Sequence, residues 1–290
     1  MDFDMNRTAV TPKDAATVVL VRDGANGVEI FCVERNKQSR FMGGAIVFPG
    51  GKLDAADSSP AWLARTTSPR TPQLSKEPFA NDEVHLRALA IAAARETLEE
   101  AALLHTTGLG VSNDDVTMLR ERLTTDASAL EAFLSERGVL LDLAVLRPLA
   151  RWITPIAESR RFDARFFVAK APEGQNGAHD ERETMASFWA TPAEILRRGE
   201  VGEVTLMAPT HRTIAVLATC KTTEDVFELA AKSSLDPICP RLVKQKTDDG
   251  ETLALVLPGD PEHDVAEVRV PGPSRYVLRG KRWCSENAPR

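Results

Sequence analysis

The sequence has few cysteines and no long apolar run, and each shortage excludes a class of protein. Four cysteines stand far apart among 290 residues without a CxxC pair, so we expect neither a zinc site nor a disulfide framework. The N-terminal residues show no basic segment followed by an apolar one, and no apolar run approaches the ~20 residues that cross a bilayer. These features predict a cytoplasmic protein with reduced thiols and no membrane partner.

Positive charge is also scarce. The 36 Lys and Arg residues are outnumbered by 42 Asp and Glu residues, which gives a formal net charge of -6. This balance argues against broad electrostatic capture of nucleic acid, so we expect any anionic substrate to be held by a local site. The sequence also lacks a G-x-S-x-G elbow, a Walker-type phosphate loop and paired histidines. It therefore does not indicate a serine hydrolase, a P-loop nucleotide hydrolase or a histidine-based metal site.

The order of the elements predicts an α/β fold. Two β-prone runs, 15–22 and 28–35, are joined by turn-forming residues and predict a hairpin. The strongest helix is expected from Glu83 to about Leu104, because this segment is dominated by Ala, Leu, Arg and Glu. Further strands are expected at 145–153, 162–170 and 184–189, and further helices at 114–122, 127–137, from Thr191 and near 209–232.

We expect a main domain of residues 1–212 and a C-terminal helical and β extension of residues 213–290. In the extension, Pro/Gly turns alternate with short β-like runs at 252–257 and 275–279. The sequence assigns no activity to this part. It either mediates association into a homodimer or shapes the substrate pocket, and both readings stay open.

The long helix carries the residues with the clearest chemistry. Glu96 and Glu100 lie one turn apart on one face, with Glu99 beside them. Three carboxylates this close repel each other unless cations neutralise them, and Arg95 is expected to pair with one of them, most naturally Glu99. Hard divalent cations prefer carboxylate oxygens, so this face predicts a Mg²⁺ or Mn²⁺ site. The alternative is an acidic helix face exposed to water.

A glycine pair precedes this helix. Gly50 and Gly51 allow the backbone to approach a ligand or a metal closely and to turn carbonyl groups towards it, while Pro49 stiffens the entry. A glycine loop that leads to an acidic helix suits a metal ion bound to a pyrophosphate.

With these two segments the sequence resembles the Nudix hydrolase superfamily, whose box reads G-x5-E-x7-R-E-U-x-E-E-x-G-U, where U is bulky and apolar. The box residues present are Gly51, Arg95, Glu96, Glu99, Glu100 and Leu103. Asp57 stands where the family has its first glutamate, Thr97 takes the first apolar position, and Ala102 replaces a glycine. About thirty additional residues split the box, and we assign 58–84 as the insertion. The resemblance implies a Nudix α/β/α sandwich with a mixed β-sheet.

A second motif resembles the coenzyme A diphosphatase branch, in which an insertion splits the box at the same place. Its pattern, L-L-T-x-R-S-x3-R-x3-G-x3-F-P-G-G, is matched by Arg35, Arg40, Gly44 and the segment 48–51, whereas the L-L-T and S positions differ. The resemblance implies that Arg35, Arg40 and the two glycines bind substrate, because a guanidinium group can bind phosphate through two bonds. The alternative is that both arginines are ordinary surface charges.

Two further residues are candidates. Many Nudix enzymes take another acidic residue from a loop after the box, either as a metal ligand or as the general base, and Glu183 stands at the expected place. The same residue would otherwise belong to a turn exposed to water. Arg161 precedes a run of alternating charged and aromatic residues and is a candidate substrate-binding arginine. That run would otherwise be a strand with charged outer positions.

Together these features predict a hydrolase that uses Mg²⁺ or Mn²⁺ to cut a pyrophosphate bond in a small nucleotide-linked substrate. The implied metal ligands are the Gly50 carbonyl, Glu96, Glu99 and Glu100, with Arg95 orienting Glu99. The branch implies coenzyme A or acyl-coenzyme A as substrate, with 3′,5′-ADP and a 4′-phosphopantetheine as products. One alternative is another Nudix substrate, such as ADP-ribose, a nucleotide sugar or a dinucleoside polyphosphate. The other is a catalytically weak nucleotide-binding regulator, for which Asp57 and Ala102 are the support.

Overall fold

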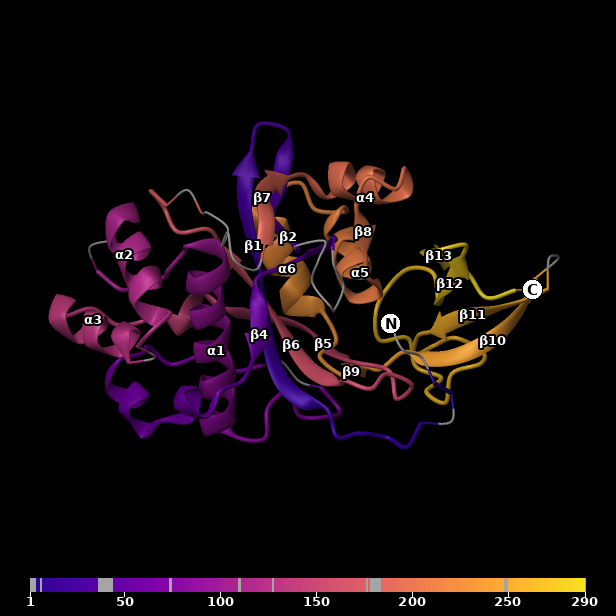
Figure 1. Cartoon of the computed structure of the whole chain (residues 1–290), viewed down its shortest axis with the longest axis horizontal. Helices are drawn as coiled ribbons and strands as arrows, with labels where there is room; N and C mark the ends of the chain where they lie inside the picture. Colours follow the sequence, from indigo (N-terminus) through magenta and orange to yellow (C-terminus); the bar gives the residue numbers. More distant parts are fainter. Residues whose placement is uncertain are drawn as a thin grey trace.

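A mixed sheet lies between two layers of helices in the computed structural model of the chain (Figure 1). The structure describes residues 4–5, 7–35, 44–72, 75–108, 111–126, 128–175, 177, 184–247 and 250–289. The order of the first sheet is β8-β3-β2-β1-β6-β5-β9, and in addition β4 pairs with β1 and β7 with β2. Its strands are β1 (Lys13–Gly24), β2 (Gly27–Arg35), β3 (Ala45–Val47), β4 (Gly50–Lys52), β5 (Arg147–Ile153), β6 (Phe162–Lys170), β7 (Thr184–Ala190), β8 (Thr205–Leu206) and β9 (Pro237–Ile238).

Strand β1 organises this sheet. It forms the predicted hairpin with β2, in which Gly24 faces Gly27 across a two-residue turn. It also pairs in parallel with β6 from Lys13 to Val21, and antiparallel with β4, where Ala16 faces Gly51. Parallel and antiparallel neighbours on one strand make the sheet mixed, as the resemblance implied. The pairing with β4 brings the glycine pair against the centre of the sheet.

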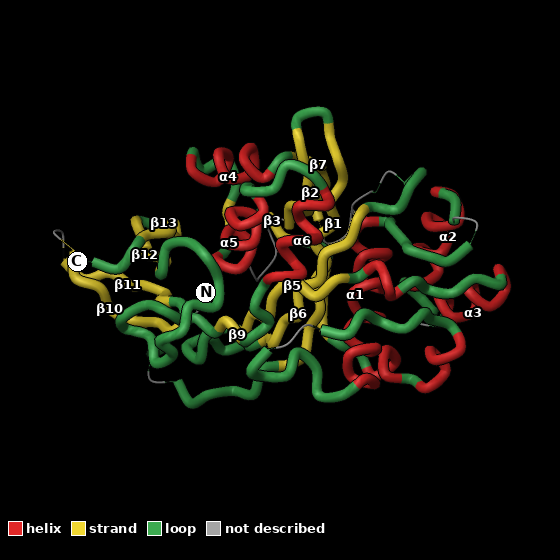
Figure 2. The backbone as a smooth tube through the Cα atoms, turned by 180° about the vertical axis from the view of Figure 1, so that it is seen from behind, coloured by secondary structure: helices red, strands yellow, loops and turns green. Residues whose placement is uncertain are grey.

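Alternation along β1 separates two apolar cores. Ala16, Val18 and Leu20 pack with the layer of α1, α2 and α3, whereas Val19 and Val21 pack with the layer of α4, α5 and α6. Figure 2 shows the second layer from behind. The helices are α1 (Glu83–Ala101), α2 (Asn113–Leu123), α3 (Ala129–Arg137), α4 (Pro192–Glu200), α5 (Ala208–Leu217) and α6 (Thr223–Lys232). The predicted α/β/α sandwich is therefore confirmed. No helix among the described residues is long and apolar enough to cross a bilayer.

Helix α1 begins and ends at identifiable caps. The Asp82 carboxylate accepts a hydrogen bond from the backbone N–H of His85 at 2.7 Å, which satisfies one of the free donors of the first turn. The helix ends earlier than predicted, because Ala102 adopts a left-handed conformation with φ of 51°. Glycine adopts this conformation without steric cost, which explains why the Nudix box has glycine at the position of Ala102.

The segment between the two halves of the box is anchored in the core. It contains the short 3-10 helices η1 (Ala55–Ser58) and η2 (Pro60–Ala64), followed by irregular chain up to α1. Trp62 and Phe79 are both buried, and the Phe79 ring contacts the Phe167 ring edge to face. The described part of the predicted insertion, residues 58–84, is thus attached at two aromatic side chains, for which spacing along the sequence gave no signal.

The C-terminal part forms a second, antiparallel sheet in the order β10-β11-β12-β13. Its strands are β10 (Arg241–Thr247), β11 (Gly250–Val256), β12 (Arg275–Arg279) and β13 (Arg282–Glu286), of which only β11 and β12 were predicted. The predicted boundary between residues 212 and 213 falls inside α5, and the predicted helical stretch is divided into α5 and α6. Helix α6 packs on β5, and β9 pairs with β5, so both α6 and β9 belong with the first sheet. The separate sheet therefore starts only at Arg241.

Candidate active site

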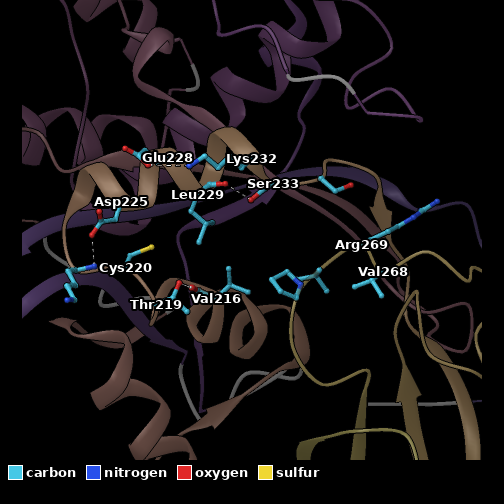
Figure 3. A pocket seen from close by; sticks show the side chains of 14 residues that line it. Val216, Thr219, Cys220, Asp225, Glu228, Leu229, Lys232, Ser233, Val268 and Arg269 are labelled. Atoms are coloured by element: carbon cyan, nitrogen blue, oxygen red, sulfur yellow. Dashed lines mark hydrogen bonds and ion pairs between the residues drawn. The ribbon is translucent and has the colours of Figure 1, made fainter.

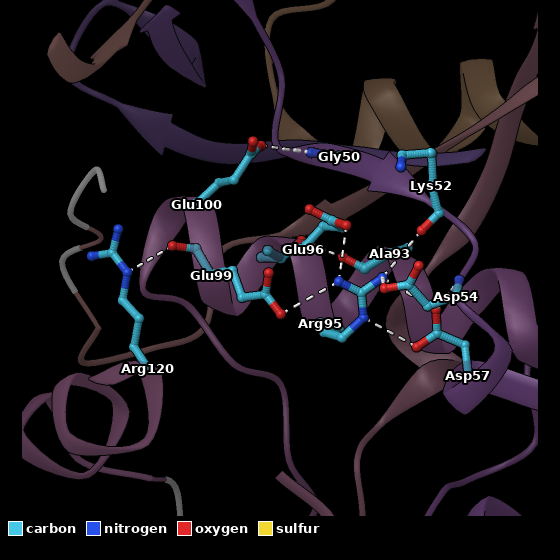
Figure 4. A network of polar contacts seen from close by, with 11 residues as sticks. Gly50, Lys52, Asp54, Asp57, Ala93, Arg95, Glu96, Glu99, Glu100 and Arg120 are labelled. Carbon is cyan, nitrogen blue, oxygen red and sulfur yellow. Dashed lines mark hydrogen bonds and ion pairs between the residues drawn. The ribbon is translucent and has the colours of Figure 1, made fainter. Parts of the chain in front are cut away.

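The glycine strand β4 lies against the acidic face of α1 (Figure 4). The N–H of Val18 donates to the carbonyl oxygen of Pro49 at 2.9 Å, so the next residue, Gly50, turns its own N–H and C=O away from β1. The Gly50 N–H donates to Glu100 Oε2 at 2.9 Å. Both halves of the split box therefore meet at a direct contact between strand and helix.

This contact leaves no room for a side chain on either glycine. A Cβ on Gly51 would lie 2.2 Å from Glu96 Oε1, and a Cβ on Gly50 would lie 2.5 Å from the carbonyl oxygen of Ala16. Both distances are well inside van der Waals contact. At Gly50 the added Cβ would meet backbone atoms, which cannot move away, whereas at Gly51 the end of the Glu96 side chain would have to shift. The glycines thus allow the backbone of β4 to lie directly against the carboxylates of α1.

Arg95 donates hydrogen bonds to three carboxylates at once. Its Nη1 donates to Glu96 Oε1 at 2.9 Å and to Glu99 Oε1 at 3.3 Å. Its Nε and Nη2 each donate to one oxygen of Asp57 at 3.1 Å. The expectation that Arg95 pairs with a single carboxylate, Glu99, is therefore wrong, because the five N–H groups of a guanidinium can serve several acceptors. The two-bond partner is Asp57.

Asp57 is the site residue whose role the sequence reading missed. Its side chain is 2% exposed, and it also accepts a hydrogen bond from the backbone N–H of Asp54 at 2.9 Å. From the sequence alone, Asp57 is only a departure from the glutamate of the Nudix box. Its position in that box was the available signal, since the shorter side chain still carries the charge that holds Arg95 in place.

Arg120, on α2, is a second neighbour that sequence reasoning did not find. Its Nε donates to the backbone carbonyl oxygen of Glu99 at 2.6 Å, near the C-terminal end of α1 (Figure 4). This bond satisfies a carbonyl group in the last turn of the helix and holds the segment that carries the glutamates. No spacing rule joins residues 99 and 120, because the contact depends on how α2 packs on α1.

Burial makes the acidic face hard to ionise. It raises the pKa of Glu96 to about 7, with repulsion from Glu99 acting in the same direction and the nearby Arg95 guanidinium opposing both. Burial also raises the pKa of Glu99. Arg95 therefore offsets only part of the cost of ionising these buried glutamates, and a further cation beside them would favour their charged forms.

The donor set fits a hard divalent cation. Glu96, Glu99 and Glu100 offer carboxylate oxygens beside the Gly50 carbonyl, and Mg²⁺ and Mn²⁺ prefer such ligands. Among the described residues, no three side chains of metal-ligating type are already gathered around one point. Glu96 is turned to Arg95, and Glu100 is turned to the Gly50 N–H. Binding a cation through all of them would require these side chains to change rotamer.

The structure corrects one predicted substrate residue. Arg161 is buried, and its guanidinium donates to the carbonyl oxygens of Thr154 at 2.9 Å and Val10 at 2.7 Å. It therefore ties the chain before β1 to the loop between β5 and β6 and does not offer a free guanidinium to a phosphate.

Of the remaining predicted residues, Arg35 is the one that the structure describes. It is the last residue of β2 and pairs with Thr184 at the start of β7. Its Nε is buried and has no acceptor among the described residues, so the side chain has a free donor. Arg40 and Glu183 lie outside the described residues, and their assigned roles stay predictions.

A mixed sheet between helices, with a glycine strand against a glutamate-rich helix, defines the site of a Nudix pyrophosphate hydrolase. The chain belongs to this superfamily, in the NUDT19-type acyl-coenzyme A diphosphatase branch, because the family model described as NUDT19 Nudix domain matches residues 12–217. The recognised family is thereby confirmed, and the chain is an enzyme of the Nudix diphosphatase family. Members of this family typically depend on divalent metal ions.

Individual relatives agree with this assignment. The chain is 25% identical over 272 residues to the acyl-coenzyme A diphosphatase NUDT19 of Gallus gallus, across 80% of this chain and 72% of the relative. It is 26% identical over 276 residues to the protein of the same name from Homo sapiens, across 81% and 72%. The crystal structure of a NUDIX hydrolase from Alicyclobacillus acidocaldarius superposes with a TM-score of 0.65 at 30% identity, across 79% of this chain and all of that one.

Proposed function

We propose that this protein hydrolyses the diphosphate of coenzyme A or acyl-coenzyme A in the presence of Mg²⁺ or Mn²⁺. The observation that carries the proposal is the contact of Gly50 and Gly51 with the carboxylates of Glu96 and Glu100. The choice of substrate is supported by the motif around Arg35 and by the two relatives named acyl-coenzyme A diphosphatase.

In this scheme water attacks one phosphorus atom, and the anhydride bond between the two phosphates breaks. The products are 3′,5′-ADP and 4′-phosphopantetheine, acylated if the substrate was. The bound metal would neutralise developing charge and lower the pKa of the attacking water. Glu96, Glu99, Glu100 and the Gly50 carbonyl would hold it. Asp57 holds Arg95, and Arg95 in turn fixes Glu96 and Glu99 on the face towards β4.

A substrate panel tests the proposal. Coenzyme A, an acyl-coenzyme A, ADP-ribose, a nucleotide sugar and a dinucleoside polyphosphate are incubated with the enzyme and Mg²⁺ or Mn²⁺, and the nucleotide products are separated. Release of 3′,5′-ADP with the highest kcat/KM supports the proposal. AMP released faster from another substrate would replace coenzyme A as the substrate class, and tight binding without turnover would indicate a nucleotide-binding regulator.

A matched pair of variants tests the role of the acidic face. Glu100→Gln is expected to lower kcat by at least about 100-fold, because a neutral amide is a weaker ligand than a carboxylate for the divalent cation that would neutralise the charge developing on the phosphate. Glu83→Gln, in the exposed first turn of the same helix, should leave kcat unchanged. Both variants should keep the wild-type circular dichroism spectrum. A folded Glu100→Gln enzyme with near-normal turnover would contradict the scheme.

A further inference from the structure

A groove of about 810 Å³ lies in the helical layer opposite α1 (Figure 3). Helices α5 and α6 form two of its walls, and the chain at 268–271 closes one end. Its apolar lining includes Val216, Leu229, Val268 and Val270. Leu229 and Val270 belong to the core on the side of α5 and α6, whereas the helix with the catalytic glutamates packs in the other core. The groove is thus separate from the diphosphatase site.

A narrow pit of about 60 Å³ adjoins the groove on the inside. The two cavities share wall residues, among them Leu229, Arg269 and Pro271, and the pit extends to Trp152 on β5. This volume equals that of about two water molecules, since one occupies ~30 Å³ in the liquid, so the pit has room only for a group as small as a carboxylate. A nucleotide base or a sugar is too large for it.

Two residues that line the pit each carry a buried hydrogen-bond donor without an acceptor among the described residues. Trp152 is 3% exposed, and its indole N–H has no partner among the described residues. The Nε of Arg269 is buried in the same way, although its Nη1 donates to the carbonyl oxygen of Pro237 and its Nη2 to Glu77. Buried donors are nearly always paired in folded proteins, so two unpaired donors on one cavity indicate a missing acceptor.

The charges around the pit favour an anionic acceptor. Arg269 is part of the pit wall, and none of the described residues that line the pit is an Asp or a Glu. The hydroxyl groups of Ser233 and Ser234 already donate to the Leu229 carbonyl and to Asp236.

The acidic residues of the outer groove are likewise occupied. Asp225 accepts from the backbone N–H groups of Lys221 and Thr222, and Glu228 pairs with Lys232. An anion in the pit would therefore lie near two donors and near the Arg269 charge, which is shared with Glu77 outside the pit wall, without a competing carboxylate among the described residues of that wall.

We propose that this cavity pair binds a carboxylic acid with an apolar chain. The carboxylate lies in the pit and accepts from Trp152 Nε1 and Arg269 Nε, while the chain lies along the apolar wall of the groove. A carboxylate has three heavy atoms and fits the pit, and the aliphatic walls supply the surface that an alkyl chain buries. This site is independent of the proposed diphosphatase activity.

Calorimetric titration of the full chain tests the proposal with octanoate as the probe. We expect saturable binding at one site per chain. Acetate should bind at least about tenfold more weakly because it lacks the chain, and octylamine should not bind because it carries the wrong charge. Octyl phosphate, with the same chain and a bulkier head, should bind more weakly than octanoate. Absence of saturable octanoate binding, or equal binding of octylamine, would overturn the proposal. Tighter binding of octyl phosphate would overturn the assignment to carboxylates.

Matched tryptophan variants locate the site. Trp152→Phe keeps an aromatic ring but removes the donor, and it should weaken octanoate binding by about tenfold, the effect of one hydrogen bond to a charged group. Trp283→Phe, on β13, should bind as the wild type does. If both variants bind equally, the proposal fails.

A measurement on the wild type covers the case in which Trp152→Phe does not fold. The chain has four tryptophans, so ¹⁵N-labelled protein gives four indole N–H signals. These are assigned from the Trp62→Phe, Trp189→Phe and Trp283→Phe variants, with Trp152 identified by elimination. Octanoate should shift the Trp152 signal most, and an unchanged Trp152 signal at saturating octanoate would overturn the proposal.

Discussion

Single residues determine how the acidic face of α1 is held. Asp57 is almost completely buried and binds Arg95 through two hydrogen bonds, while Arg95 contacts Glu96 and Glu99. Without Asp57, the guanidinium would keep only its contacts to the two glutamates and to nearby oxygens at the edge of β4. If Glu96 and Glu99 bind a metal ion as proposed, the carboxylate of Asp57 would limit how strongly Arg95 competes with that ion for them.

We expect Asp57→Asn to lower kcat/KM by about 10- to 100-fold and the free energy of unfolding by about 1–3 kcal/mol, because Arg95 loses a charged, buried partner. Asp54→Asn is the matched control, since Asp54 is 66% exposed and lies 3.7 Å from the same guanidinium. It should change kcat/KM by less than about threefold and the free energy of unfolding by about 0.5 kcal/mol. Steady-state kinetics and urea unfolding measure the two effects. Equal effects of the two variants would show that Asp57 has no special role.

Gly51→Ala is expected to reduce kcat by at least about 100-fold, because the new methyl group would displace the Glu96 carboxylate from its place beside β4. The loss of unfolding free energy should be about 1–3 kcal/mol, as for other overpacked sites. Gly280→Ala is a control for stability alone. Its φ of 62° disfavours alanine, but no atom lies within 4 Å of the added Cβ. It should cost about 1 kcal/mol with unchanged kcat. Full activity of Gly51→Ala would contradict the close contact between β4 and α1.

At the scale of elements, α5 joins the two sheets. Arg212 on this helix is fully buried, and its guanidinium donates to the carbonyl oxygens of Pro271 and Pro273 and to the hydroxyl groups of Tyr276 and Ser285. The neighbouring His211 also contacts the Tyr276 hydroxyl, at 3.0 Å. A charged side chain is tolerated here because each of the three guanidinium nitrogens donates to an oxygen of the second sheet or its connecting chain.

This contact predicts a pH dependence of stability. Burial, with a smaller contribution from the Arg212 charge, lowers the pKa of His211 to about 4, compared with 6.5 for a free histidine. The unfolded chain therefore takes up a proton at higher pH than the folded chain does. The stability that His211 contributes is fully present above pH 6.5 and is lost as the pH falls towards 4.

We expect the wild-type protein to lose about 2 kcal/mol more of its unfolding free energy between pH 7 and pH 4.5 than His211→Gln does, because glutamine cannot take up a proton. Urea unfolding of both proteins at the two pH values gives the comparison. Parallel losses in the two proteins would show that the protonation of His211 is not coupled to folding.

At the scale of the whole molecule, the second sheet completes a core that it shares with the first. Leu242, Leu255 and Tyr276 pack in the same apolar cluster as Val19, Ile214 and other residues of the first sheet and its helices. The part matched by the Nudix family model ends at residue 217, so α6 and the second sheet are additions to the matched region. They are nonetheless part of one continuous core.

A chain that ends after Pro240 should therefore fail to unfold cooperatively. It would expose the apolar surface that the second sheet covers and leave Arg212 without the acceptors of its guanidinium. Thermal unfolding followed by circular dichroism, with size-exclusion chromatography, measures this. A truncated protein with one sharp transition and wild-type diphosphatase activity would instead show that residues 241–290 form an accessory sheet.

Local patterns predicted much of the fold and the centre of the candidate site. The hairpin, the long helix and the spacing of Glu96, Glu99 and Glu100 depend on residues that are close along the chain, and their positions follow from turn chemistry and helix geometry. Helix α1 ends before the predicted Leu104 because Ala102 is left-handed, a conformation that an alanine in the sequence does not signal. Strands β10 and β13 were missed because their residues alternate weakly between apolar and polar and need neighbouring strands to be stable.

The sequence by itself determined the chemistry of the long helix and its glycine strand. The spacing of carboxylates along a helix and the backbone freedom of two glycines depend only on residues that are close in the sequence. Only the tertiary structure decided which distant groups these residues meet. In the fold, Asp57 binds Arg95 although 38 positions separate them, and Arg161 donates to backbone carbonyl groups. Trp152 and Arg269 line one pit. The physical reason is that such contacts depend on how helices and strands pack, and packing follows from the whole core and not from any one segment.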